Sequence, residues 1–99
     1  MSRGLGLIQR RLTEILQERD GLLDTFEIAA SAYGVVPDEE GTIDLSRAQV
    51  VAVRRALRSL SKKGIAVDMG RQWHDGRRRW GSTKAAERYQ ERVRTVFGR

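Results

Sequence analysis

The chain has 99 residues, a length that fits one domain and leaves no room for a separate ligand-sensing or catalytic domain. It has no cysteine, which excludes disulfides and thiolate metal sites, and no apolar run long enough for a membrane span or a signal peptide. A cytoplasmic protein is therefore expected, and its net charge of +6 makes it basic.

The charge is divided unevenly along the chain. Residues 1–45 hold four arginines against nine acidic residues, a balance of −5, whereas residues 46–99 hold fifteen basic residues against four acidic ones, a balance of +11. This asymmetry suggests that one half faces a polyanion while the other half supports it. Arginine greatly outnumbers lysine, which suits bidentate contacts to phosphate and guanine, although a GC-rich genome would produce the same bias.

The first predicted elements are two helices separated by a very short strand. Apolar residues at helical spacing predict a helix over residues 2–19, ended by Asp20 and Gly21, and Leu22 and Leu23 could form a short strand. Asp24 and Glu27 then form a capping box that begins a second helix over residues 25–33, closed by Gly34.

Residues 35–45 form an acidic connection that contains the only proline of the chain. The segment is either a solvated surface loop or a place where Thr42 and Ile43 add to a sheet, and its composition favours the loop.

A third helix is predicted over residues 46–63. Ser46 and Gln49 form its capping box, and Gly64 can take the left-handed conformation that ends it. Its apolar face carries Val50, Val53, Leu57 and Leu60 at steps of three and four.

The opposite face of this helix is basic. It carries Arg47, Val51, Arg55, Arg58 and Lys62, with Arg54 on its flank, and no acidic residue occurs between Asp44 and Asp68. Like charges four residues apart cost a few tenths of a kcal/mol per pair in an isolated helix. A solvated helix surface is the alternative interpretation, but such surfaces normally mix both signs, so the pattern favours a polyanion as partner.

After Gly64 the pattern changes to alternation, which predicts a β-hairpin over residues 65–81. Asp75 and Gly76 are typical of a two-residue type I′ turn, which would place Trp73 opposite Arg78 and Arg71 opposite Trp80. Four arginines would then flank the tip: Arg71, Arg77, Arg78 and Arg79. Ser82 and Thr83 begin a last helix, predicted over residues 83–97.

Two stretches resemble a known family. Residues 53–65, VRRALRSLSKKGI, are similar to the junction of recognition helix and wing in winged helix-turn-helix proteins. Residues 80–83, WGST, look like the point where the wing of MarR-like and PadR-like bacterial regulators returns into a helix. The resemblance covers about residues 24–86 and departs from the family in the long, acidic connection before the third helix. It implies an α+β, mainly α, winged-helix fold with a three-helix core, a β-hairpin wing and a C-terminal helix.

The resemblance and the charge together imply a small, sequence-specific transcriptional regulator that binds double-stranded DNA. The third helix would enter the major groove, where arginine can grip guanine and Val51 can touch a thymine methyl group. The wing would contact phosphates or the minor groove. The expected DNA-binding residues are Arg47, Ala48, Val51, Arg54, Arg55 and Arg58 on the helix and Arg71, Arg77, Arg78 and Arg79 on the wing.

Other residues give little support for further chemistry. Trp73 and Trp80 fit hairpin packing better than base stacking, and His74 has no second histidine or cysteine to form a metal site. No catalytic or phosphate-loop spacing occurs, so neither an enzyme nor a cofactor nor a small-molecule effector is expected.

Three alternatives stay open. The chain could bind RNA or a protein partner within a larger assembly, or bind DNA nonspecifically as an architectural or replication-associated protein. It could also form a homodimer through the N-terminal helix and through four residues of the last helix: Tyr89, Val93, Val96 and Phe97.

Overall fold

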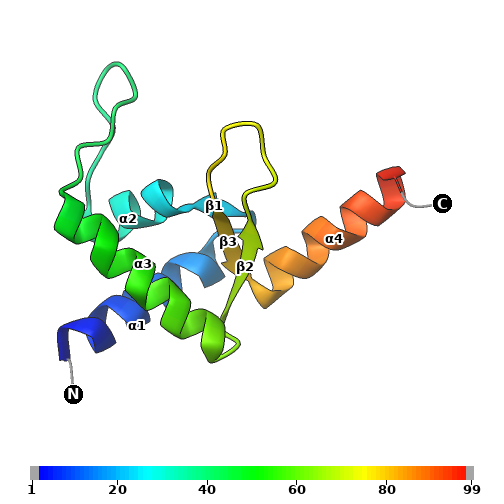
Figure 1. Ribbon diagram of the computed structural model, residues 1–99, viewed down its shortest axis with the longest axis horizontal. Coiled ribbons are helices and arrows are strands. Elements are labelled where there is room, and N and C mark those ends of the chain that lie inside the picture. The colour runs from blue at the N-terminus through cyan, green and yellow to red at the C-terminus, as the bar shows by residue number, and fades with distance from the viewer. Residues whose placement is uncertain (1–2, 98–99) are drawn as a thin grey trace.

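The computed structural model describes residues 3–97 of the chain, and side chains within residues 6–96. It has an α+β fold, mainly helical, with four helices and a three-stranded antiparallel sheet among these residues (Figure 1). The elements are α1 (Arg3–Glu18), β1 (Leu23–Asp24), α2 (Thr25–Tyr33), α3 (Arg47–Lys62), β2 (Ala66–Gly70), β3 (Arg79–Ser82) and α4 (Thr83–Phe97). The four predicted helices are therefore confirmed, although the expected start of the first at Ser2 lies outside the described residues. None of the described helices is both long and apolar enough to cross a membrane.

Capping residues set the ends of α2 and α3. The Asp24 carboxylate accepts the Glu27 N–H at 2.8 Å, and Ser46 Oγ accepts the Gln49 N–H at 3.1 Å, so both predicted capping boxes form. Gly34 and Gly64 end the two helices with positive φ angles of 68° and 78°. At each end the N–H groups of the glycine and of the residue after it bond back to helix carbonyls, which fixes the point where the chain leaves the helix.

The sheet has the strand order β1-β3-β2, and its register corrects the predicted hairpin. Asp68, not Arg71, lies opposite Trp80, and Gly70 pairs with Arg79 after a register shift. The strands therefore end earlier than predicted, and residues 71–78 form a loop in place of a two-residue turn. We call this segment the β2–β3 loop.

Side-chain hydrogen bonds explain why the tight turn does not form. Asp68 Oδ1 accepts the Gly70 N–H at 2.9 Å, and Asp75 Oδ1 accepts the Arg77 N–H at 3.0 Å. Such local bonds compete with strand pairing. The Gly76 N–H bonds to the Trp73 carbonyl at 3.0 Å, so the turn is centred one residue earlier than the Asp75–Gly76 pair.

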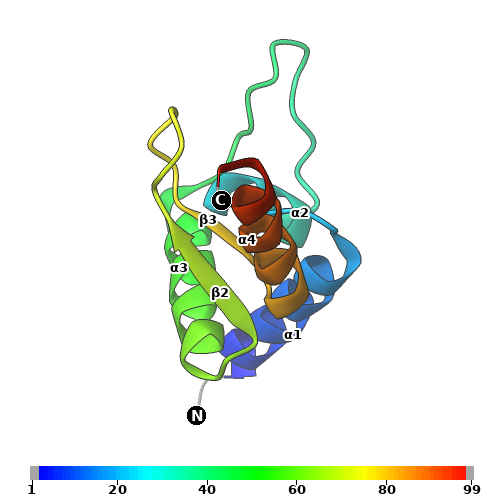
Figure 2. The ribbon, with the colours of Figure 1, turned by 90° about the vertical axis from the view of Figure 1, so that its right-hand side faces the viewer.

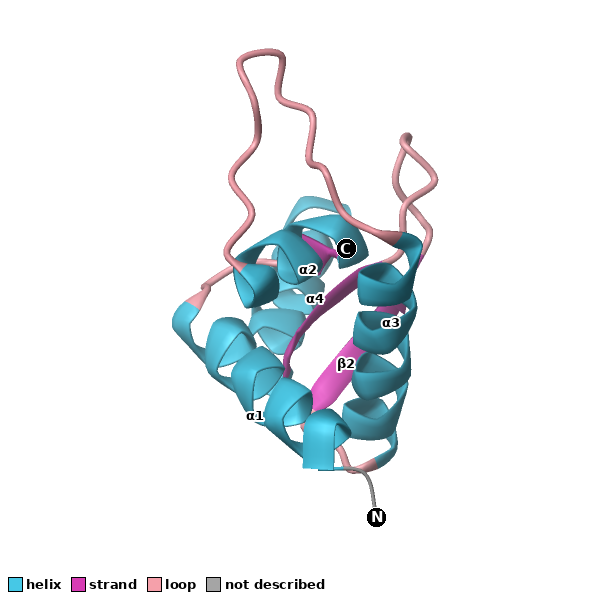
Figure 3. Ribbon diagram, turned by 90° about the vertical axis from the view of Figure 1, so that its left-hand side faces the viewer, coloured by secondary structure: helices cyan, strands magenta, loops and turns pink. Residues whose placement is uncertain are grey.

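Helices α1, α2 and α3 lie on one side of the sheet (Figure 3), and the hydrophobic core lies between them and the sheet. Trp80 of β3 is 3% exposed, and its Nε1–H donates to Thr25 Oγ1 at 3.1 Å. This tryptophan therefore joins the sheet to α2. The main buried residues of the three helices are Leu12, Ile15, Leu16, Ile28, Ala29, Val53, Ala56, Leu57 and Leu60.

The acidic connection protrudes from the body at the same end as the β2–β3 loop (Figures 1 and 2). Its tip is ordered by Asp38, whose Oδ1 accepts the N–H groups of Glu40 and Thr42 at 2.9 and 2.8 Å. Thr42 and Ile43 join none of the described strands, so the sheet alternative is wrong and the surface-loop interpretation is confirmed.

Gly81 of β3 leaves no room for a side chain, and replacing it should destabilise the fold. A Cβ atom there would lie 2.7 Å from Leu22 Cδ2 and 3.3 Å from Ala85 Cβ. We expect Gly81→Val to lower the free energy of unfolding by about 1–3 kcal/mol, the usual cost of overpacking, as measured by urea denaturation. Gly21→Val is the control, because nothing lies within 4 Å of its added Cβ. Equal losses for both variants would show that the close approach is not the cause.

Candidate nucleic-acid interface

The solvent-facing side of α3 carries an unpaired positive charge. Five exposed basic residues lie on it, and among the side chains that the structure describes none of the five forms an ion pair: Arg47, Arg54, Arg55, Arg58 and Lys62. Ala48 is exposed beside them, whereas Val51 is only half-exposed. The predicted basic face therefore exists, but Val51 offers less apolar surface than a fully exposed residue would.

The β2–β3 loop and the start of β3 carry less free charge than the face of α3, because three of their four predicted DNA-binding arginines are ion-paired. Arg77 lies 3.3 Å from the Asp24 carboxylate, Arg78 2.6 Å from Asp68, and Arg79 2.9 Å from Asp75. Arg71 is exposed and has no such partner within the described residues. None of these three carboxylates was predicted as an arginine partner. Only the Asp75–Arg79 spacing of four residues could have indicated one of them.

Arg79 is best described as a structural residue. Its side chain is only 21% exposed, and its guanidinium group makes two hydrogen bonds to the Asp75 carboxylate, at 2.9 and 3.3 Å. The same group lies 4.7 Å from the centre of the Trp73 ring, within cation–π range. Arg79 therefore holds the β2–β3 loop in shape and presents less charge to a partner than the prediction assigned to it.

Arg77 connects the β2–β3 loop to the acidic front half of the chain. Its partner Asp24 is buried, whereas the Arg77 side chain is 54% exposed and lies over the Phe26 ring at 5.5 Å. The Arg78–Asp68 pair is exposed, and such pairs contribute only about 0–1 kcal/mol, so a phosphate could replace the carboxylate at Arg78 at small cost. Removing Arg77 would leave the buried Asp24 carboxylate without its charged partner, which costs more. Arg78 can therefore still contribute to a polyanion site, but less than an unpaired arginine, whereas Arg77 is held by Asp24.

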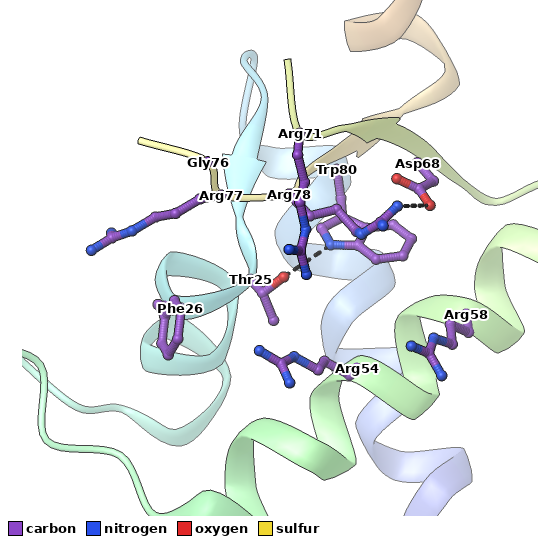
Figure 4. Close-up of a pocket in the computed structure, with 10 residues that line it drawn as sticks. All are labelled: Thr25, Phe26, Arg54, Arg58, Asp68, Arg71, Gly76, Arg77, Arg78 and Trp80. Atoms are coloured by element: carbon purple, nitrogen blue, oxygen red, sulfur yellow. Dashed lines mark hydrogen bonds and ion pairs between the residues drawn. The ribbon is translucent and has the colours of Figure 1, made fainter. Parts of the chain in front are cut away.

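A concave pocket of about 440 Å³ lies where α3, the start of α2 and the β2–β3 loop meet (Figure 4). In this view Arg54 and Arg58 project from α3 towards the space below Arg71 and Arg78. Five arginines and one aspartate line the pocket, so its positive charge is only partly neutralised. We call it the arginine pocket; its lining residues are Thr25, Phe26, Arg54, Arg58, Asp68, Arg71, Gly76, Arg77, Arg78 and Trp80.

The Asp75 carboxylate should show a measurable pKa shift. The hydrogen bond from the Arg77 backbone N–H and then the hydrogen bonds from the Arg79 side chain lower its pKa from the ordinary value of 3.8. The lowered pKa means that this contact favours the fold above pH 3.8 and is lost as the pH falls through the folded-state pKa. We expect an NMR titration of the Asp75 carboxyl carbon to give a midpoint below 3.8, and Arg79→Gln to move that midpoint upward. A midpoint unchanged by Arg79→Gln would contradict the contact.

Helix α4 extends away from the body, as Figure 1 shows. Of the residues predicted for a dimer contact, Tyr89 is half-buried and its ring lies 5.7 Å from that of Trp73, while Val93 is half-exposed and Val96 is 64% exposed. Phe97 ends the helix, but its side chain lies outside those described. Tyr89 is thus already in contact within the chain, whereas Val96 and, on α1, Leu7 at 67% exposed present apolar surface. The homodimer stays a prediction.

No family model matches the sequence, and neither a curated protein nor a solved structure is significantly similar to it. Within the described residues no group of histidine and acidic side chains could hold a metal ion, and His74 is exposed in the β2–β3 loop. The arginine pocket and the face of α3 are therefore the features from which a function can be inferred.

Proposed function

We propose that this protein binds double-stranded DNA through α3 and the β2–β3 loop, in the manner of a winged helix-turn-helix domain. The observation that carries the proposal is the face of α3, where Arg47, Arg54, Arg55 and Arg58 are exposed and lack ion-pair partners among the described residues. A helix surface with one sign of charge is repulsive by itself and is stabilised when a polyanion covers it.

In this arrangement α3 lies in the major groove, which is wide enough to admit a helix. Arg47, Ala48, Arg54 and Arg55 would lie near base edges, where arginine recognises guanine through two hydrogen bonds. Val51, half-exposed, would approach a thymine methyl group. The β2–β3 loop takes the part of the wing.

The arginine pocket lies between these two contacts, so it would cover the phosphate backbone that separates the major groove from the adjacent minor groove. Arg58 and Arg71, which have no ion-pair partner among the described side chains, contribute positive charge there, and Arg78 would exchange Asp68 for a phosphate. Arg79 would keep the loop in shape.

Sequence-specific binding, as in a transcriptional regulator, can be tested by selecting bound duplexes from a random pool. The proposal predicts an enriched sequence, and a palindromic one would indicate that the protein binds as a dimer. Direct competition with single-stranded DNA and RNA provides the comparison. Tighter binding to RNA, or no binding to any nucleic acid, would contradict the proposal and favour an RNA or a protein partner.

A further inference from the structure

The arginine pocket is concave and is lined by five arginines from α3 and the β2–β3 loop. We propose that it is a binding site for a small, free anion that carries several linked phosphoryl groups, and that this anion excludes duplex DNA. Its volume of about 440 Å³ falls within the range of small-molecule pockets, roughly 300–1,000 Å³. A single phosphate would fill only part of this space.

The charges around the pocket suit such a ligand. Three of its arginines, Arg54, Arg58 and Arg71, have no ion-pair partner among the described side chains, and they come from two different elements. The guanidinium group binds phosphate oxygens through two parallel hydrogen bonds. Arginines on opposite sides of the pocket can therefore hold neighbouring phosphoryl groups of one molecule (Figure 4).

The floor of the pocket offers a further contact. Thr25 is 6% exposed and Trp80 is 3% exposed, so both are largely shielded from water. Thr25 Oγ1 accepts the hydrogen bond from Trp80 Nε1, which leaves the hydroxyl hydrogen free to donate to a ligand oxygen. Hydrogen bonds to charged oxygens are stronger in such a shielded place than on an open surface.

Binding of this anion would regulate the protein, because Arg54 and Arg58 belong both to the pocket and to the proposed DNA-binding face. An anion held by these two side chains removes them from contact with a duplex, so the two ligands compete. The competition rests on the proposed function, whereas the binding of the anion does not.

Isothermal titration calorimetry with inorganic triphosphate, at constant ionic strength, tests the site. We expect saturable binding at one site, with sulfate binding much more weakly. Arg54→Gln and Arg71→Gln should each weaken binding by about tenfold, because each removes one charged hydrogen-bonding partner. Asp68→Asn should strengthen binding, because it releases Arg78 and removes the one carboxylate that lines the pocket.

Arg55→Gln is the matched control, since Arg55 is a neighbouring, exposed arginine of α3 that does not line the pocket. This variant should bind triphosphate like the wild type but lose affinity for duplex DNA. Thermal unfolding of every variant shows whether it is folded.

If Arg54→Gln and Arg55→Gln weaken triphosphate binding equally, or if the protein does not prefer triphosphate over sulfate, the proposed anion site is wrong. A duplex that binds equally well with and without saturating triphosphate would overturn the competition. If triphosphate does not bind while the duplex does, the inference fails and the proposed function stands. If triphosphate binds and no duplex does, the proposed function fails and the site stands.

Discussion

Replacing Arg54, Arg55 and Arg58 together by glutamine should weaken binding to duplex DNA by at least about a hundredfold, since each lost base or phosphate contact costs about 1–3 kcal/mol. The three side chains are exposed and have no ion-pair partner among the described residues, so nothing within the fold should be lost with them. Fluorescence anisotropy with a labelled duplex, repeated over a range of salt concentrations, measures both the affinity and its salt dependence. The slope of log affinity against log salt should become less steep by about 0.9 for each phosphate contact that is removed.

A matched variant on α4 provides the control for this experiment. Lys84, Arg92 and Arg94 are exposed, and like the α3 arginines they form no ion pair within residues 6–96. Replacing these three by glutamine removes the same charge from a different face. If both triple variants weaken binding equally, net charge alone attracts the DNA, and the assignment of α3 is wrong.

Replacing Trp80 by alanine should lower the free energy of unfolding by about 3–5 kcal/mol, the usual cost of removing a buried aromatic side chain. Trp80 is 3% exposed, lies on the central strand of the sheet and bonds to Thr25. The variant leaves a cavity in the core, and the Thr25 hydroxyl loses the hydrogen bond that Trp80 Nε1 donates to it. Because about 1 kcal/mol shifts the melting temperature of a 60–100-residue domain by roughly 4–8 °C, the loss should be evident in a thermal scan.

Trp73→Ala is the comparison for that experiment. Trp73 is half-exposed and contacts Tyr89 and Arg79 at the edge of the structure, so we expect a loss of only about 1 kcal/mol, typical of such aromatic contacts. A larger loss for Trp73 than for Trp80 would mean that the core is centred elsewhere.

The helices could be predicted from the sequence because their signals are local. Asp24 and Glu27 mark the start of α2, and Gly34 marks its end. The observed bounds of the helix agree with the predicted ones. The basic face of α3 was likewise predictable, because helical spacing decides which residues share a face. These patterns depend on neighbouring residues alone.

The β2–β3 loop could not be predicted in the same way. The Asp75–Gly76 pair is typical of a tight turn, but the Asp75 carboxylate bonds to the Arg77 backbone and to the Arg79 side chain instead. The contact between Arg77 and Asp24 joins residues 53 positions apart, so it depends on how α2 packs against the sheet. Tertiary contacts of this kind decide how much arginine charge is free, and no local pattern indicates them.

Backbone amide NMR of the labelled protein during titration with duplex DNA tests the central claim most directly. If α3 and the β2–β3 loop form one DNA-binding surface, the largest shift changes occur in residues 47–58 and 71–78, while α4 and the acidic connection change little. The largest changes in α4, or in residues 35–45, would contradict that surface.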